Sequence, residues 1–310
     1  MSLSPVPRYD PACPALPGLI ICGFTKCATS TLHLWLTQHP RIRGGIRKEL
    51  GYFHDPQSYF FDPKANWRDH GAAGLKPLFA DAREGEVLLD ATPGYAHHLT
   101  ARDVIPHLPG PPLCVFVLRD PAQQIVSTWR YFSNNRGYIP KEIGLSQFVD
   151  MVLSGEASER FAQDHLRDCI ERARFSVVLD EWAHALPPDR MLVLEMGAML
   201  ANPRAAVASV LARLDLSFEG YEDFDWPSEN RSYSVRSTRL RAVAEVGRTL
   251  LPHDGTLRRA VRGAYRALNT TRPSPVSGGT DQSQEIARLR RALAHEYDVL
   301  AARGIIFADR

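Results

Sequence analysis

A lysine and several hydroxyl side chains follow directly on a short apolar run, and residues of these types at this spacing can bind an anion. The apolar run covers Leu19–Gly23, and a helix is expected to begin soon after Lys26. The first N–H groups of a helix have no acceptor within it, so together with the lysine charge they form a phosphate site. The predicted site, called the loop site below, comprises Lys26, Cys27, Ala28, Thr29, Ser30 and Thr31.

The elements around this loop are predicted from local pattern. Apolar Leu32, Trp35 and Leu36 indicate a helix that stops before Pro40, because the residue preceding a proline is disfavoured in the α region. The run before the loop indicates a strand. An ordinary turn, in which the lysine and threonines only cap the helix, is the open alternative.

A Walker loop is disfavoured by the order of residues. That loop needs glycine, lysine and then serine or threonine at consecutive positions, where this chain has Ala28, Thr29 and Ser30. Lys26 comes two residues before Ala28 instead of directly after it. A loop for a 5'-phosphate with an early lysine fits the sequence better.

A second pair of anion-binding side chains follows another apolar run, Leu113–Leu118. Arg119 ends this run, Pro121 restarts a helix, and Ser127 lies about two turns further on. Arginine offers a planar fork of donors to a dianion, and serine adds a short hydroxyl donor. We predict a second phosphate at this arginine site, with an ion pair between Arg119 and Asp120 as the alternative.

In this order, the two sites resemble those of the sulfotransferase family that uses 3'-phosphoadenosine 5'-phosphosulfate (PAPS), more closely its heparan-type glycan branch and the bacterial relatives of that branch. Lys26 to Leu32 resembles the family's 5'-phosphosulfate loop, and Arg119 with Ser127 resembles its 3'-phosphate motif. The resemblance implies PAPS as donor and adenosine 3',5'-bisphosphate (PAP) as product. It also implies weaker candidates for the 3'-phosphate, Arg236 and Ser237, although a solvated basic face explains them almost as well.

The segment Lys48 to Asp55 is similar to the family's Lys-Glu-Pro-His-Phe-Phe segment, in which the glutamate is the general base. The resemblance makes Glu49 the base, Lys26 the stabiliser of the leaving group and Lys48 a second contact to the sulfonate. Leu50-Gly51 replaces Pro-His, a departure on the acceptor side. The alternative for Glu49 is a solvated charge paired with Lys48 or Arg47, with His54 or His98 as base.

The acceptor side carries weaker signals. Asp90 to Tyr95 resembles the family segment that lines the acceptor cleft, and aromatic Trp67 lies in a segment, 57–74, that we expect to be a loop. Packing is the commoner role of such aromatic residues, and a surface helix start is as plausible for His98. The candidate acceptor contacts are Lys48, Trp67, Tyr95 and His98.

The fold is predicted to be a single α/β domain with a central, mostly parallel sheet flanked by helices, the P-loop-like sulfotransferase fold. Predicted strands alternate with helices, and 310 residues of 44% apolar content can bury one large core. We expect an extended N-terminal arm at 1–17 and a sulfotransferase domain at 18–310, with a mobile loop at 269–284 before a final helix to about Arg303. The predicted strands are Leu19–Gly23, Glu86–Asp90, Leu113–Leu118 and Met191–Leu194.

Composition narrows the class of protein. A net charge of +2 gives no nucleic-acid signature, and no apolar run is long enough for a membrane span. Five cysteines, with Cys22 and Cys114 in predicted strands, favour free thiols in a reducing compartment. A zinc site at Cys22, Cys27 and His33 is disfavoured. We expect a cytoplasmic protein without membrane, nucleic-acid or metal partners, and the oligomeric state stays open.

The sequence therefore favours a sulfotransferase that moves a sulfuryl group from PAPS in line to a hydroxyl, less readily an amine, of a small-molecule or sugar acceptor. One alternative is a nucleoside or small-molecule kinase, which predicts ATP affinity with magnesium; beyond Asp90 there is no acidic strand end of the kind it needs. A nucleotide-binding module without turnover is the non-enzyme alternative.

Overall fold

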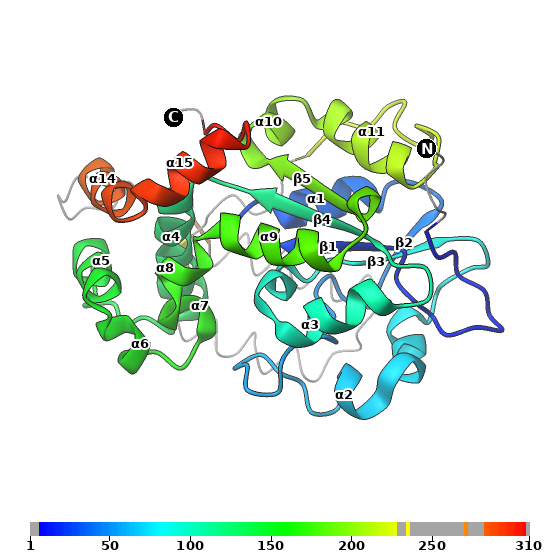
Figure 1. The fold of residues 1–310 in the computed structure, drawn as a ribbon, viewed down its shortest axis with the longest axis horizontal. Helices are drawn as coiled ribbons and strands as arrows, with labels where there is room; N and C mark the ends of the chain where they lie inside the picture. The colour runs from blue at the N-terminus through cyan, green and yellow to red at the C-terminus, as the bar shows by residue number, and fades with distance from the viewer. Residues whose placement is uncertain (1–5, 228–233, 236–269, 272–281, 308–310) are drawn as a thin grey trace.

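The computed structural model describes residues 6–227, 234–235, 270–271 and 282–307 (Figure 1). Its centre is a five-stranded sheet of order β2-β3-β1-β4-β5, in which every neighbouring pair is parallel. This confirms the predicted single α/β domain with a parallel sheet. The strands are β1 Leu19–Gly23, β2 Ile42–Gly44, β3 Val87–Asp90, β4 Leu113–Leu118 and β5 Met191–Glu195.

The strand order places a topological switch between β1 and β4. The chain leaves β1 toward β2 and β3 on one side of the sheet, and leaves β4 toward β5 on the other side. Ligands of open parallel sheets bind outside the carboxyl ends of the strands at such a point. The residues that follow β1 and β4 are those of the two predicted anion sites.

Helices cover both faces of the sheet and extend beyond its carboxyl edge (Figure 1). Helices α3 and α9 lie side by side on the face turned toward the viewer, whereas α1 packs against α11. Figure 1 shows α5 to α8 and α14 grouped beyond the ends of β4 and β5. The helices are α1 Thr29–Leu36, α2 Trp67–His70, α3 Leu99–Val104, α4 Pro121–Arg130, α5 Leu145–Ser154, α6 Glu156–Arg160, α7 Asp164–Arg167, α8 Cys169–Arg172, α9 Phe175–Ala185, α10 Met196–Ala201, α11 Pro203–Arg213, α14 Gln282–Ala292 and α15 Ala294–Ala302.

Two apolar clusters form the core. The larger one surrounds the sheet, whose strands β1, β3 and β4 are buried along their whole length. Burial on both faces explains why these strands read as continuous apolar runs. The second cluster joins α4 to α5 through α8 and to α14. Helix α4 thus connects the carboxyl edge of the sheet to the helical group beyond it.

Several local expectations need correction. The final helix is broken at Leu293 into α14 and α15, and residues 282–284 already belong to α14. Of the rest of 269–284, Thr270–Thr271 pairs antiparallel with Ser234–Val235, and the other positions lie outside the described residues. The expected loop at 57–74 contains α2 and runs into a 3₁₀ segment, Gly71–Phe79.

Two further expectations concern the state of the cysteines and the presence of membrane-spanning helices. All five cysteines are free thiols, and Cys22 and Cys114 are buried in neighbouring strands as predicted. In the part of the chain that the structure describes, no helix combines the length and apolar character needed to cross a bilayer.

We expect the core between the sheet and α9 to depend on Trp182. Its ring is fully buried 5.4 Å from that of Phe116, and its indole N–H donates to the Ala96 carbonyl at 3.0 Å. Trp182→Ala should lower the free energy of unfolding by about 3–5 kcal/mol, because the ring leaves a cavity. Urea unfolding measures it. Val177→Ala, at a 53% exposed position of the same helix, should change stability by less than about 0.5 kcal/mol, and equal losses would contradict the expectation.

Candidate active site

The loop site has a left-handed backbone and an uncapped helix start. Lys26 and Ala28 have φ angles of 65° and 56°, and α1 begins at Thr29. Ala28 occupies the cap position and makes no side-chain cap bond, so the cap residue itself is neither the lysine nor a threonine. The Thr31 N–H already donates to the Ala28 carbonyl at 3.0 Å. The N–H groups of Thr29 and Ser30 precede it and, at the start of a helix, are the ones suited to an anion.

The Lys26 ammonium is half-buried above an aromatic ring. Its Nζ lies 4.0 Å from the ring centroid of Tyr131, within cation–π distance. Burial first, and then the charge of Arg119, lower the pKa of Lys26 to about 8, although the Glu49 charge acts to raise it. Tyr131 opens a π-helical turn, Tyr131–Arg136, and such turns occur often at functional sites. Tyr131 is not among the predicted site residues, although its position four residues after Ser127 was a usable signal.

The Arg119 guanidinium is largely buried and incompletely paired. Its Nη1 donates to the Lys26 carbonyl at 3.4 Å and its Nη2 to Gln123 Oε1 at 3.3 Å, whereas its buried Nε has no hydrogen-bond partner. The alternative ion pair with Asp120 is not formed, because that carboxylate binds Arg290 at 2.8 Å. A buried cationic donor without an acceptor is a place where an anion binds favourably.

The two predicted anion sites are in contact. Besides the bond from Arg119 to the Lys26 carbonyl, Gln124 Nε2 donates to the Thr25 carbonyl at 3.2 Å. The first turn of α4 thus holds the loop that follows β1. Ser127 lies on the same helix, half-buried. Arg236 and Ser237 lie outside the described residues.

Glu49 forms the ion pair that was considered as its alternative role, and it also faces the loop site. Its Oε1 lies 2.8 Å from Lys48 Nζ, and its side chain is 59% exposed. The same carboxylate raises the pKa of Lys26 and of His33, a residue of α1. Burial, followed by the Lys48 charge, brings the pKa of His33 to about 4, so this ring is neutral near pH 7.

A buried carboxylate positions the segment that carries Glu49. Asp90, at the end of β3, accepts hydrogen bonds from Thr92 Oγ1 at 2.7 Å and from the Tyr95 hydroxyl at 2.8 Å, and the Leu50 N–H lies 3.4 Å away. Burial raises the pKa of Asp90 to about 6. Tyr95 is fully buried, so it supports the Lys48 to Asp55 segment, called the wall below, from behind.

Two histidine rings lie close together, tilted by 40°, near Tyr95. The rings of His54 and His98 have centroids 4.5 Å apart, and His98 Nδ1 accepts from the Asp55 N–H at 3.2 Å. Asp55 in turn caps α3 by accepting from the Leu99 and Thr100 N–H groups. Burial lowers the pKa of His54 to about 4. His98 is 5% exposed and directly precedes α3, so the helix start considered as its alternative role is observed, but not at the surface.

Other polar groups reach this region from α7 and α8. Burial is the main cause that lowers the pKa of His165, and the charge of Arg172 lowers it as well. The pKa of His54 is lowered mainly by burial, then by His98, and to a smaller extent by Arg172. Arg172 Nη1 and His165 Nδ1 are buried without hydrogen-bond partners. Their contacts join distant parts of the chain, so no local motif predicts them. Trp67 packs against Phe53, with ring centroids 5.3 Å apart.

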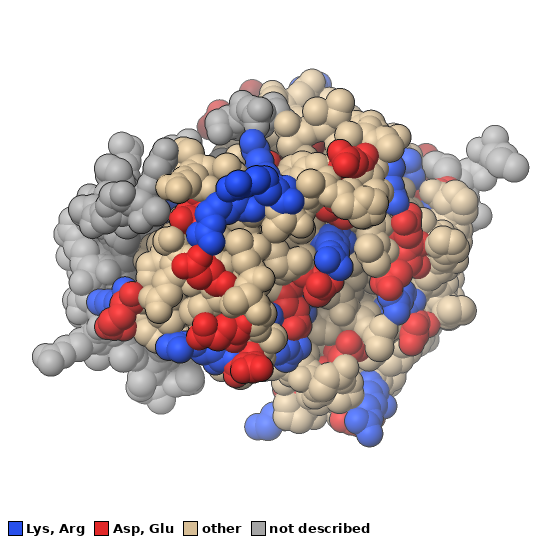
Figure 2. All heavy atoms as spheres, turned by 60° about the vertical axis from the view of Figure 1, so that its left-hand side comes forward, with Lys and Arg blue, Asp and Glu red and all other residues tan. Residues whose placement is uncertain are grey.

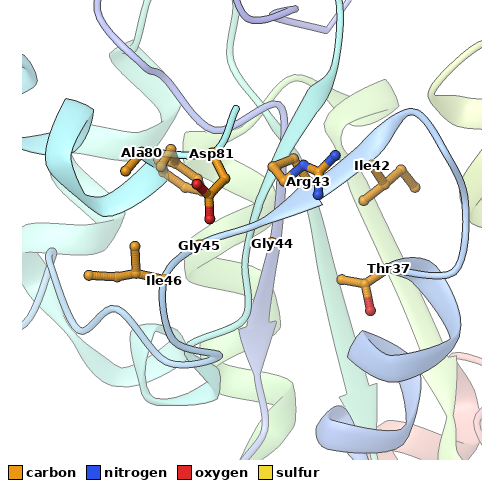
Figure 3. Close-up of a pocket in the computed structure, with 9 residues that line it drawn as sticks. Thr37, Ile42, Arg43, Gly44, Gly45, Ile46, Ala80 and Asp81 are labelled. Carbon is orange, nitrogen blue, oxygen red and sulfur yellow. The ribbon is translucent and has the colours of Figure 1, made fainter. Parts of the chain in front are cut away.

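Away from the predicted site, the described residues form a surface of mixed charge on one face (Figure 2) and a cavity at the edge of the sheet. Figure 2 shows Lys and Arg interspersed with Asp and Glu on the face turned toward the viewer. A cavity of about 180 Å³ opens at edge strand β2 and includes none of the predicted site residues (Figure 3). Among the described residues no group of three His, Cys, Asp or Glu could hold a metal ion. The cavity is lined by Thr37, Ile42, Arg43, Gly44, Gly45, Ile46, Phe79, Ala80 and Asp81.

The sequence matches no protein-family model and no curated protein. Its structure is similar to that of a sulfotransferase from Alicyclobacillus acidocaldarius, with 16% identity and a TM-score of 0.58 over 82% of this chain and 96% of that chain. Sulfotransferase domains from the curacin biosynthetic pathway and from the Synechococcus PCC 7002 olefin synthase have 14% and 12% identity, and TM-scores of 0.38 and 0.39. Each of these two alignments covers 90% of this chain; the first covers 98% of the curacin domain and the second 94% of the olefin synthase domain. The first likeness shows that this chain has a sulfotransferase fold.

The lowered pKa of Lys26 predicts a pH dependence of anion binding. Sulfate stays a dianion across neutral and alkaline pH, so only the protein titrates. As pH rises through about 8, free Lys26 loses its proton, and sulfate affinity should fall by up to about tenfold per pH unit. Calorimetric titration from pH 7 to 9.5 measures it. Lys26→Arg should remove the fall, and a fall that persists in this variant would assign it to another group.

Proposed function

We propose that this protein is a PAPS-dependent sulfotransferase. The observation that carries the proposal is the buried Arg119 guanidinium with an unpaired Nε, held against the loop of Lys26 at the switch point of the sheet. Two cationic sites in contact suit a ligand with phosphates at two positions. The sulfotransferase fold and the residue types at both sites support the same reading.

In this proposal the loop site binds the 5'-phosphosulfate and the arginine site binds the 3'-phosphate. The N–H groups of the first turn of α1 and the Lys26 ammonium face the first anion. Arg119 and Ser127 bind the second, with Arg236 and Ser237 as further proposed contacts. PAP is then the product that stays bound at both sites until release.

Transfer requires an attacking acceptor oxygen, a base and a stabilised leaving group. The acceptor oxygen forms a bond to sulfur while the bond from sulfur to the phosphate oxygen breaks, and the acceptor proton passes to Glu49. Lys26, with a pKa of about 8, is still mostly protonated at pH 7 and neutralises the charge that grows on the phosphate. These roles need only positioning and charge, which the described residues supply.

Glu49 must release Lys48 to act as the base. An exposed carboxylate exchanges partners at low energetic cost, and its 59% exposure permits this. Lys48 is then free to contact the sulfonate. His54 and His98 are the reserve bases of this proposal, and burial keeps the His54 ring neutral.

The acceptor is proposed to be a hydroxyl, less readily an amine, of a small molecule or sugar. The likeness of Lys48 to Asp55 to the glycan branch supports the sugar, and Lys48 and His98 are the proposed contacts. Trp67 and Tyr95 pack behind the wall and support it. The protein is further proposed to be cytoplasmic and to need no metal.

Arg119→Ala should remove the preference for a 3'-phosphate. We expect affinity for PAP to fall about 10–100-fold, the range for a lost charged hydrogen bond, while affinity for 5'-AMP changes little. Calorimetric titration of both nucleotides measures it. Arg102→Ala, which removes an exposed ion pair with Glu181, is the control. Equal loss for both nucleotides would defeat the assignment, and wild-type binding of ATP but not PAP would favour a kinase.

Glu49→Gln should separate binding from turnover. Loss of a general base lowers turnover by about 100-fold or more, whereas PAP affinity should stay nearly unchanged. Acceptors are first found by screening compounds with PAPS for the mass gain of one SO₃, and turnover is then timed. Glu181→Gln, an exposed carboxylate on α9, is the control. Unchanged turnover would remove Glu49 from the mechanism, and PAP binding without turnover in the wild type would favour a binding module.

A further inference from the structure

Asp120 places a negative charge directly beside the proposed 3'-phosphate site. It follows Arg119 in the chain, is 5% exposed, and its charge raises the pKa of Arg119 after burial has lowered it. At such short range in a partly buried place, a free carboxylate would attract the guanidinium and repel a phosphate dianion. The arginine site therefore depends on what binds this carboxylate.

Two residues from the C-terminal helices bind it. Asp120 Oδ2 accepts from Arg290 Nη2 at 2.8 Å and from Arg290 Nε at 3.2 Å. Asp120 Oδ1 accepts from the Tyr297 hydroxyl at 2.9 Å and from the Gln123 N–H at 2.8 Å. Arg290 lies on α14 and Tyr297 on α15. Four donors thus engage the carboxylate and offset the negative charge that it places beside Arg119.

The same contacts order the first turn of α4. The Tyr297 hydroxyl also accepts from the Ala122 N–H at 3.2 Å, so it shares the helix N-terminus with Asp120. Gln123 accepts from Arg119, and Gln124 donates to the Thr25 carbonyl. The C-terminal helices are therefore connected through one helical turn to both anion sites.

We propose that Arg290 and Tyr297 are positioning residues for nucleotide binding. By engaging Asp120 they leave the Arg119 guanidinium available to the 3'-phosphate, and they act without touching the nucleotide. The inference rests on the proposed function, because it concerns the site that we assign to the 3'-phosphate. It adds residues that neither phosphate motif contains.

The chain offers a matched control for helix docking alone. Glu296, the neighbour of Tyr297, accepts from Ser176 N–H at 2.8 Å and from Ser176 Oγ at 2.6 Å, which anchors α15 to the start of α9. Ser176→Ala weakens this second anchor and leaves the contacts of Asp120 in place. It should lower stability without changing nucleotide preference.

The test measures the ratio of affinities for PAP and 5'-AMP in the full chain. Arg290→Gln should reduce the preference for PAP by about tenfold or more, because the Asp120 charge is released. Tyr297→Phe should reduce it less and in the same direction, and Arg290→Lys should retain most of it. Adding Asp120→Asn to Arg290→Gln should restore the preference, since asparagine still caps α4 and carries no charge.

Each outcome decides one question. A wild type without preference for PAP over 5'-AMP would overturn the 3'-phosphate assignment, and with it the proposed function. The other case is a wild type that prefers PAP while the Arg290 and Tyr297 variants have the same ratio of PAP to 5'-AMP affinity as the Ser176→Ala control. That result would overturn only the inference. Thermal unfolding checks each variant, and if Arg290→Gln does not fold, Tyr297→Phe, which removes a single hydroxyl, decides the test.

Discussion

Parallel pairing of β1 with β4 forces two cationic groups together. Lys26 and Arg119 each follow one of these strands, so they meet at the same edge, and the Arg119 charge lowers the pKa of Lys26. The ring of Tyr131 and the carbonyl of Lys26 offset part of that repulsion. An anion bound between the two would remove the remainder, so the sheet topology favours the anion site that we propose.

Three acidic side chains near this edge are held by donors. Asp90 is bound by Thr92 and Tyr95, Asp55 by the start of α3, and Asp120 by the C-terminal helices. Each of these three carboxylates thereby orders the backbone around it. Glu49 differs because it is exposed and paired only with a flexible lysine, the state that suits a group that must exchange a proton.

Local pattern predicted what local interactions determine. Strands β1 and β4 have the expected bounds, because a strand buried on both faces is a continuous apolar run. Edge strand β2 has three residues and was too short to recognise. The break at Leu293 contains neither glycine nor proline, so tertiary packing and not local sequence sets it.

At the site, too, local motifs can be predicted from the sequence, and contacts between distant residues cannot. Lys26 and Arg119 each belong to a contiguous motif from which a site can be predicted, whereas Tyr297 contacts Asp120 from 177 positions away. Such a separation also fixes an order of events. A ribosome makes the arginine site long before it makes α14 and α15, so a nascent chain carries Asp120 uncovered beside Arg119. If Asp120 must be covered as we propose, the arginine site is completed only after these distant helices have docked.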